Sequence, residues 1–179
     1  PTWDTTSHRA AGGTYSIHSC ETTRPAPQYY VKNTASWIDS KPLDLSGYDW
    51  ARIRFEAWID VPDDDIDDCL EVGYATDPAL YSNYTWGKVN TDTDGWQTFT
   101  MNLSPMCGQS AVYVAFLFYS DSDNRVAEGA YVDNVIITAG MDDKYEENDT
   151  LGEAWDFTGG DGQWLSAYPG GGEKAIQGD

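Results

Sequence analysis

The sequence predicts an all-β protein, an antiparallel β-sandwich or jelly roll with a short irregular C-terminal extension. Three observations support this prediction. Apolar and polar residues alternate with a period of two in several segments. These segments are short and are separated by turns rich in Asp, Gly and Ser, such as DLSGYD and TDTDG. No segment combines an apolar period of 3.6 residues with recognisable helix caps.

Each strand is predicted from its own pattern, in chain order. Residues 51–61 (ARIRFEAWIDV) place apolar side chains at the odd positions, as in an antiparallel strand with one buried face. Residues 69–75 (CLEVGYA) and 95–103 (GWQTFTMNL) alternate in the same way. Residues 110–120 (SAVYVAFLFYS) are apolar on both faces, which predicts a central strand of the sandwich. Residues 130–138 (AYVDNVIIT) close the series.

The composition changes after residue 139, which predicts two parts. Residues 1–139 contain the predicted strands and form the jelly-roll sandwich. Residues 140–179 are rich in Gly and acidic residues and hold only short apolar runs. A segment of that size and composition does not bury a core of its own. We therefore expect a linker followed by the truncated start of a second domain.

The net charge argues against two classes of partner. The 179 residues include 30 Asp and Glu against 10 Lys and Arg, which gives a formal net charge of −20. Such a surface repels nucleic-acid phosphates and anionic membranes, so we expect no nucleic-acid partner. No apolar stretch reaches about 18 residues, so we expect no membrane insertion. The 8 Trp and 12 Tyr residues are enough for a compact core despite the charge.

The sequence shows no recognisable catalytic constellation, so we expect no enzymatic activity in this region. His8 and His18 are the only histidines, which argues against a zinc hydrolase with several histidine ligands. His18 and Ser19 are neighbours in a strand and point to opposite faces, so they do not form part of one triad. The motifs HExxH and GxSxG are absent from the sequence.

Three cysteines leave two possibilities open. Cys20, Cys69 and Cys107 have neither CxxC spacing nor the spacing of zinc ligands. Cys69 begins a predicted strand and Cys107 lies in the loop that leads into another. We therefore predict a Cys69–Cys107 disulfide, with Cys20 left over. The alternative is three buried thiols.

The segment DDKYEENDT, residues 142–150, is a cluster of oxygen donors. Calcium takes six to eight oxygen ligands, often carboxylates and carbonyls. Glu146, Asn148 and Asp149 supply such oxygens within four residues, and a bound cation would offset the repulsion between neighbouring carboxylates. We predict a structural Ca²⁺ site here, with Asp179 as the last available ligand. The alternative is a solvated acidic linker between two domains.

Asp133 is a second candidate metal ligand. A carboxylate within an otherwise apolar strand is costly to bury without partners. It either contributes to a cation site or accepts hydrogen bonds from a neighbouring turn at a strand edge. The acidic run at residues 63–68 is not an EF-hand loop, because it lacks the Gly at position six and the Glu at position twelve. A solvated turn is the simpler interpretation of that run.

Tyr81, Tyr84 and Trp86 cluster in LYSNYTWGKV, residues 80–89, in an expected loop between strands. Exposed aromatic rings with amide and hydroxyl neighbours can stack on sugar rings or hold a peptide. These three residues are therefore the predicted ligand-binding residues. The alternative is that the rings close one end of the sandwich.

The acidic segment carries a family resemblance. The stretch DDKYEENDTLGEAWDF, followed by KAIQGD, resembles the start of a bacterial pre-peptidase C-terminal domain. That family opens Asp-x-Tyr-Glu-x-Asn-Asp-[Thr/Ser] and later presents Gly-Asp; Glu147 stands where a Pro is usual. The resemblance implies a non-catalytic β-sandwich appended to a secreted bacterial protease or another hydrolase. It also implies calcium binding, because related modules bind calcium through this segment.

Residues 1–139 resemble the MAM-like jelly rolls of immune-inhibitor-A-type metalloproteases. The order of YSIHSC, PLDLSGY and GAYVDNV carries the resemblance, with Cys20 where a Gly is more common. Carbohydrate-binding modules share this fold. In similar jelly rolls an aspartate of the last strand binds a structural calcium together with oxygens of the N-terminal segment. The resemblance therefore implies a metal site of Asp133 with Asp4 and Asp68.

Together, these observations predict a non-catalytic accessory region of a secreted bacterial hydrolase, stabilised by Ca²⁺ outside the cell or at its surface. A peptidase is the expected parent. The expected partners are the parent catalytic domain and a polysaccharide or protein substrate. Two alternatives are a carbohydrate-binding module and an extracellular adhesion or structural repeat.

Overall fold

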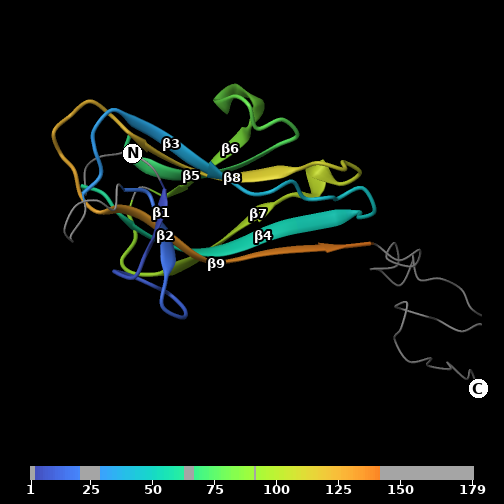
Figure 1. Cartoon of the computed structure of the whole chain (residues 1–179), viewed down its shortest axis with the longest axis horizontal. Coiled ribbons are helices and arrows are strands. Elements are labelled where there is room, and N and C mark those ends of the chain that lie inside the picture. The colour runs from blue at the N-terminus through green and yellow to red at the C-terminus, as the bar shows by residue number, and fades with distance from the viewer. Residues whose placement is uncertain (1–2, 21–28, 63–66, 91, 142–179) are drawn as a thin grey trace, which may run out of the picture. The chain divides into compact units, whose positions relative to one another are not determined.

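The computed structural model confirms the predicted fold class: two antiparallel sheets lie face to face (Figure 1). It describes residues 3–20, 29–62, 67–90 and 92–141. Sheet A has the spatial order β1 (Asp4–Thr6), β2 (Ser16–His18), β9 (Gly129–Gly140), β4 (Trp50–Asp60) and β7 (Gln97–Asn102). Sheet B has the order β3 (Thr34–Asp39), β8 (Tyr113–Ser120), β5 (Cys69–Ala75) and β6 (Thr85–Asn90).

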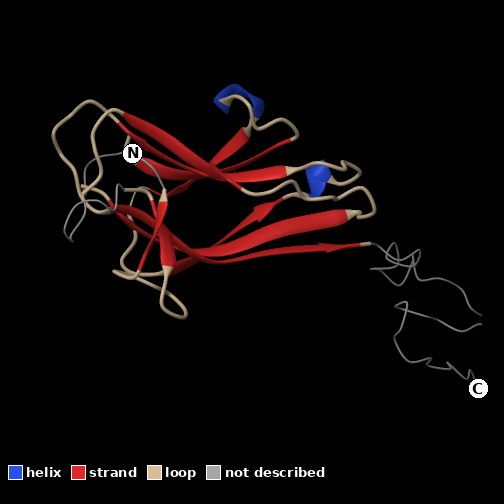
Figure 2. Cartoon of the chain, in the orientation of Figure 1, coloured by secondary structure: helices blue, strands red, loops and turns tan. Residues whose placement is uncertain are grey.

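In the part of the chain that the structure describes, two short 3₁₀ helices lie in the loops between the strands (Figure 2). Helix η1 (Tyr81–Asn83) lies between β5 and β6, and η2 (Ser104–Met106) follows β7. In Figure 1, η1 lies above β6, on the side of sheet B that faces away from sheet A. In the described part of the chain, no helix is long and apolar enough to span a membrane.

Strand β4 forms the centre of the core, as its alternation predicts. Ile53, Phe55 and Ile59 are fully buried, whereas Arg54, between Ile53 and Phe55, is exposed. The Phe55 ring packs edge-on against Phe116 of sheet B, with ring centroids 4.9 Å apart. Burying each of these large side chains contributes about 1.5–3 kcal/mol, so the inward face of β4 holds the two sheets together.

Strand β8 is buried on both faces. Phe116 and Phe118 belong to the core between the sheets. Ala115 and Leu117 point to the opposite, outer face of sheet B because side chains alternate along a strand. Both are nevertheless buried, at 0% and 1% exposure. The outer face of sheet B must therefore have a cover of its own.

Strand β9 contains a β-bulge that the sequence pattern does not show. Asn134 and Val135 together lie opposite the single residue Phe55 of β4. Asn134 has a φ of 49°, in the left-handed region that Asn tolerates better than most residues. Val132 packs in the core before the bulge and Ile137 packs against the core after it. The alternation of β9 therefore shifts by one residue at Asn134.

The predicted Cys69–Cys107 disulfide is wrong, because both residues are thiols. Cys69 pairs with Tyr119, near the end of β8, whereas Cys107 precedes Tyr113, where β8 begins. Strands rise about 3.3 Å per residue, so the two ends of β8 are roughly 20 Å apart. A disulfide needs Cα atoms within about 7 Å.

Thiol chemistry tests this correction. We expect the denatured chain to expose three reactive thiols without any reductant, and we expect Cys69 to react slowly in the folded chain. Cys69 is buried, and burial raises the pKa of its thiol to about 11, so little thiolate is present at neutral pH. Alkylation followed by peptide mass spectrometry measures both properties. A single reactive thiol after denaturation would contradict the structure.

Candidate functional site

Two rows of side chains cross the strands on the outer face of sheet B. The first row contains, from β3 to β6, Trp37, Leu117, Glu71 and Lys88. The second row contains, in the same order, Asp39, Ala115, Gly73 and Trp86. Neighbouring strands are about 4.8 Å apart, so each row places its members side by side. The register thus brings indole rings, carboxylates and an ammonium group onto one surface.

The three aromatic residues predicted as ligand-binding meet on this surface. The rings of Tyr81 and Trp86 are stacked with centroids 5.4 Å apart and an interplanar angle of 18°. The rings of Tyr84 and Trp86 are stacked at 4.7 Å and 24°. The indole Nε1 of Trp86 also donates a hydrogen bond of 3.0 Å to the backbone oxygen of Tyr81. We call these three residues, together with Trp37, the aromatic platform.

Gly73 allows the Trp86 ring to lie on the sheet. A Cβ atom at residue 73 would be 2.5 Å from Cε3 of Trp86, closer than real Cβ contacts come. The indole therefore packs directly on the backbone of β5. Since any larger residue at this position would push the ring away, the glycine determines where the centre of the platform lies.

Tyr84 and Tyr81 have different roles in the platform. Tyr84 is only 7% exposed and packs with Ala75 and Ala115, so it covers the sheet. Its hydroxyl donates a hydrogen bond to Oδ1 of Asp39, and burial together with this bond raises the pKa of Tyr84. Tyr81, by contrast, is 48% exposed. Tyr81 is the platform tyrosine that a ligand can reach.

Glu71 is the member of this surface with an unusual environment. Its Oε2 atom is buried and has no hydrogen-bond partner. Burial raises the pKa of Glu71, and the positive charge of Lys88 on β6 opposes that shift. Neither Glu71 nor Trp37 was identified from the sequence. One indication of them is present in the sequence: because β8 is apolar on both faces, residues on the neighbouring strands must cover its outer face.

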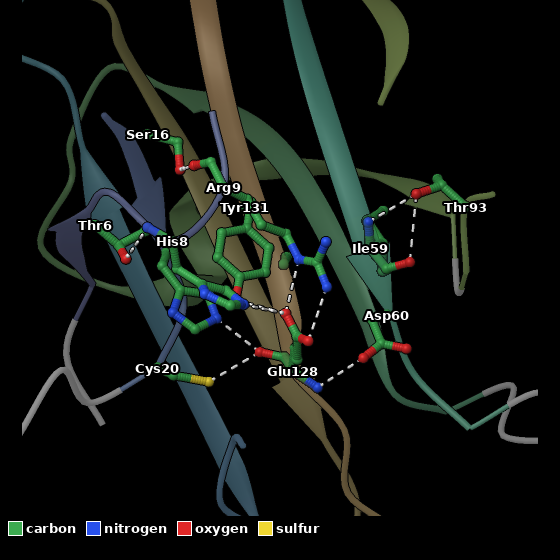
Figure 3. A network of polar contacts seen from close by, with 12 residues as sticks. Thr6, His8, Arg9, Ser16, Cys20, Ile59, Asp60, Thr93, Glu128 and Tyr131 are labelled. Atoms are coloured by element: carbon green, nitrogen blue, oxygen red, sulfur yellow. Dashed lines mark hydrogen bonds and ion pairs between the residues drawn. The ribbon is translucent and has the colours of Figure 1, made fainter. Parts of the chain in front are cut away.

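A separate polar cluster joins the N-terminal segment to the start of β9 on sheet A (Figure 3). Arg9 donates from Nε and Nη2 to the two carboxylate oxygens of Glu128, each at 2.8 Å. Tyr131 donates its hydroxyl to the same carboxylate at 2.8 Å. The hydrogen bond from Arg9 holds the pKa of Glu128 below its usual range. We call Arg9, Glu128 and Tyr131 the N-terminal clamp.

Both histidines belong to the surroundings of this clamp. His18 is fully buried, its ring stacks on Tyr131 with centroids 3.9 Å apart, and its Nε2 lies 2.7 Å from the backbone oxygen of Glu128. His8 Nε2 lies 3.5 Å from Oε2 of Glu128. The Arg9 guanidinium lies 4.1 Å from the centroid of the Trp58 ring. These contacts tie the N-terminal segment to sheet A, which is a structural role.

Asp133 has the hydrogen-bonded arrangement that the sequence left open as an alternative to metal binding. Its Oδ2 accepts hydrogen bonds from the backbone N–H groups of Ala11 and Gly12, at 2.8 and 3.0 Å. Its Oδ1 accepts one from the N–H of Asn134 at 2.7 Å. These three N–H groups occupy acceptor positions on both oxygens of the carboxylate.

The structure does not bring the other described metal candidates to Asp133. Asp68 is buried and accepts hydrogen bonds from the Tyr30 hydroxyl and from the N–H of Asp121, the latter at 2.7 Å. Asp4 accepts one from the N–H of Thr5 at 2.8 Å. Among the described residues, no group of three His, Cys, Asp or Glu could hold a metal ion. The remaining candidates lie outside the described residues: Glu146, Asn148, Asp149 and Asp179.

Comparison with known proteins gives structural likeness only. No protein-family model and no curated protein matches the sequence. The K1 cleaved adhesin domain of Lys-gingipain from Porphyromonas gingivalis W83 has a TM-score of 0.52 at 16% identity, covering 78% of this chain and 84% of that domain. A family 16 carbohydrate-binding module has a TM-score of 0.45 at 15% identity, covering 76% and 85%. The first likeness shows that the chain shares the β-sandwich fold of that adhesin domain.

Replacing Gly73 tests the geometry of the platform. We expect Gly73→Ala to displace Trp86 and to reduce the free energy of unfolding by about 1–3 kcal/mol, the usual cost of overpacking. Thermal melting and the tryptophan emission spectrum measure the two effects. Gly47→Ala is the matched control, because a Cβ at residue 47 meets nothing within 4 Å. Equal melting temperatures for the two variants would show that Trp86 does not lie on Gly73.

Proposed function

We propose that this chain is a non-catalytic binding module that holds a carbohydrate on the aromatic platform of sheet B. The observation that carries the proposal is the platform itself, an aromatic surface with polar groups at its edges. Sugar rings offer apolar C–H faces to aromatic rings and hydroxyl groups to polar side chains. The exposed ring of Tyr81 is stacked on the ring of Trp86. Glu71 and Lys88 lie in the row of side chains next to the row that contains Trp86.

The platform is also largely fixed before a ligand arrives. Trp86 is positioned by Gly73 and by its hydrogen bond to Tyr81, and Tyr84 by its hydrogen bond to Asp39. A surface whose side chains are already ordered loses less conformational entropy on binding. The solved structure with the same fold is named an adhesin domain, which is consistent with a binding role.

The setting of the module rests on the sequence resemblance. We propose that it is an accessory domain of a secreted bacterial hydrolase and acts outside the cell. Its substrate-binding surface would keep the parent enzyme close to a polymer. A protein-adhesion module is the second candidate, and the shared fold with an adhesin domain favours it. Binding of neutral polysaccharides, without binding of proteins, distinguishes the two.

Titration with polysaccharides tests the binding function. We expect the chain to bind at least one soluble neutral glycan, and we expect Tyr81→Ala to weaken binding about tenfold, since truncating a contacting aromatic residue typically costs more than 1 kcal/mol. Isothermal titration calorimetry measures the affinity. Trp96→Ala is the control, because Trp96 packs on Trp58 of sheet A, away from the platform. An equal loss in both variants, or no binding across a broad panel, would overturn the proposal.

Calcium binding is a separate proposal for the C-terminal segment. The residues proposed to hold the ion are Glu146, Asn148, Asp149 and Asp179. A ligand that binds only the folded state stabilises it by about 2.7 kcal/mol at a hundredfold excess over Kd. We therefore expect the full chain to melt several degrees higher in calcium than in excess chelator. Identical melting curves would leave the segment as a solvated linker.

A further inference from the structure

We propose that Glu71 is the specificity-determining residue of this surface: its carboxylate accepts hydrogen bonds from hydroxyl groups of an uncharged glycan that lies on the aromatic platform. This inference rests on the proposed function and adds the polar contact and the class of glycan.

Glu71 lies in the middle of the outer face of sheet B. The strand register places Leu117 of β8 on one side of it and Lys88 of β6 on the other. Trp37 lies beyond Leu117 in the same row. Tyr81 is close enough that, after burial, the charge of Glu71 is the next largest cause of its raised pKa. A glycan that contacts both Tyr81 and Trp37 would therefore pass over the Glu71 carboxylate.

The carboxylate of Glu71 is prepared for a donor that the folded chain does not provide. Its Oε2 atom is buried and accepts no hydrogen bond. Leaving a buried acceptor unsatisfied costs free energy, and most such groups in native proteins are satisfied. Oε2 is closed to solvent in this side-chain conformation, so a hydroxyl group of a bound sugar would supply the missing hydrogen bond once the Glu71 side chain turns Oε2 toward the surface. Asp39, the other carboxylate of these rows, already accepts one from Tyr84.

The charges on this surface select an uncharged glycan. The chain has a net charge of −20, and both carboxylates of the two rows lie on this face, so uronate, sulfate and phosphate groups are repelled. A cationic ligand is not required either, because Lys88 is the register partner of Glu71 and already supplies a positive charge. A neutral hydroxyl group is therefore the expected donor, because it is neither repelled by the carboxylates nor made unnecessary by Lys88.

The direction of the Glu71 pKa shift gives the pH dependence of binding. Burial raises the pKa of Glu71 in the folded chain above its value in the unfolded chain. The folded chain therefore loses stability as the pH rises through the folded-state pKa and Glu71 ionises. A hydroxyl that donates to the ionised carboxylate favours the charged form. Binding is therefore strongest above this pKa and weakens as the pH falls through it. The titratable groups that face Glu71 from neighbouring elements, or from its own strand, are Lys88, Tyr81, Tyr119, Cys69 and Asp39.

The test is the substitution Glu71→Gln in the full chain. Calorimetric titrations at pH 7 and pH 4.5 use a mixed-linkage glucan and a galactomannan as neutral probes, with polygalacturonate as the anionic probe. We expect Glu71→Gln to weaken binding of the neutral probe about tenfold at pH 7 and to abolish the pH dependence, since hydrogen bonds to charged groups are the stronger ones. Asp94→Asn, which removes an exposed carboxylate, is the matched control and should bind as the unmodified chain does.

A melting curve separates recognition from a structural role. We expect Glu71→Gln to melt at the same or a higher temperature than the unmodified chain at pH 7, because the substitution removes a buried charge. A lower melting temperature would show that Glu71 stabilises the fold through Lys88, and the inference would be wrong. It would also be wrong if Glu71→Gln bound normally while Tyr81→Ala did not, although the binding function would then stand.

Preference for polygalacturonate would overturn the inference that the bound glycan is uncharged. Binding of none of the three probes would count against the proposed function itself.

Discussion

Strand β8 must be covered on both faces, and the candidate site follows from that constraint. Its inward residues, such as Phe116, are covered by sheet A, but Leu117 on the outer face faces no second sheet. Exposing a leucine of this kind would forfeit about 1.5–3 kcal/mol. On this face Trp37, Tyr84 and Trp86 provide cover, where they pack with Ala115, which shares the outer face of β8 with Leu117. Trp37 and Trp86 therefore both cover sheet B and belong to the platform on which we propose that a ligand binds.

This double role explains why the platform is rigid and why one polar group within it is not satisfied. Trp86 and Tyr84 are held by packing and hydrogen bonds, as parts of a core are. Glu71 lies among them as a partly buried carboxylate whose Oε2 has no donor, an arrangement that lowers stability. Proteins commonly retain such destabilising groups at functional sites. The clamp on sheet A differs, because the partly buried carboxylate of Glu128 has Arg9 and Tyr131 as donors.

Features that depend on neighbours along the chain could be predicted from the sequence. The alternation of β4 and the apolar faces of β8 gave the correct strands and the correct fold class. The cluster of Tyr81, Tyr84 and Trp86 was visible because its members lie within six positions. Its place on a sheet face was not visible, because Trp37 and Glu71 join it only through the register of four strands.

Features that depend on contacts between distant segments were missed. The Cys69–Cys107 disulfide required knowing that the two residues lie at opposite ends of β8. The partners of Asp133 come from Ala11 and Gly12, far away in the sequence. The bulge at Asn134 leaves no mark in composition, because it is defined by the pairing of β9 with β4. Periodicity describes one strand at a time, whereas these features belong to pairs of segments.

The most direct test of the central claim is an NMR titration that follows the tryptophan indole N–H signals. The chain has 8 Trp residues, so each face of the sandwich carries its own reporters. On addition of a neutral glycan that binds, we expect the signals of Trp37 and Trp86 on sheet B to shift. We expect no shift for Trp58 and Trp96, which pack together away from the platform. Shifts confined to Trp58 and Trp96 would show that the glycan does not bind on the platform of sheet B.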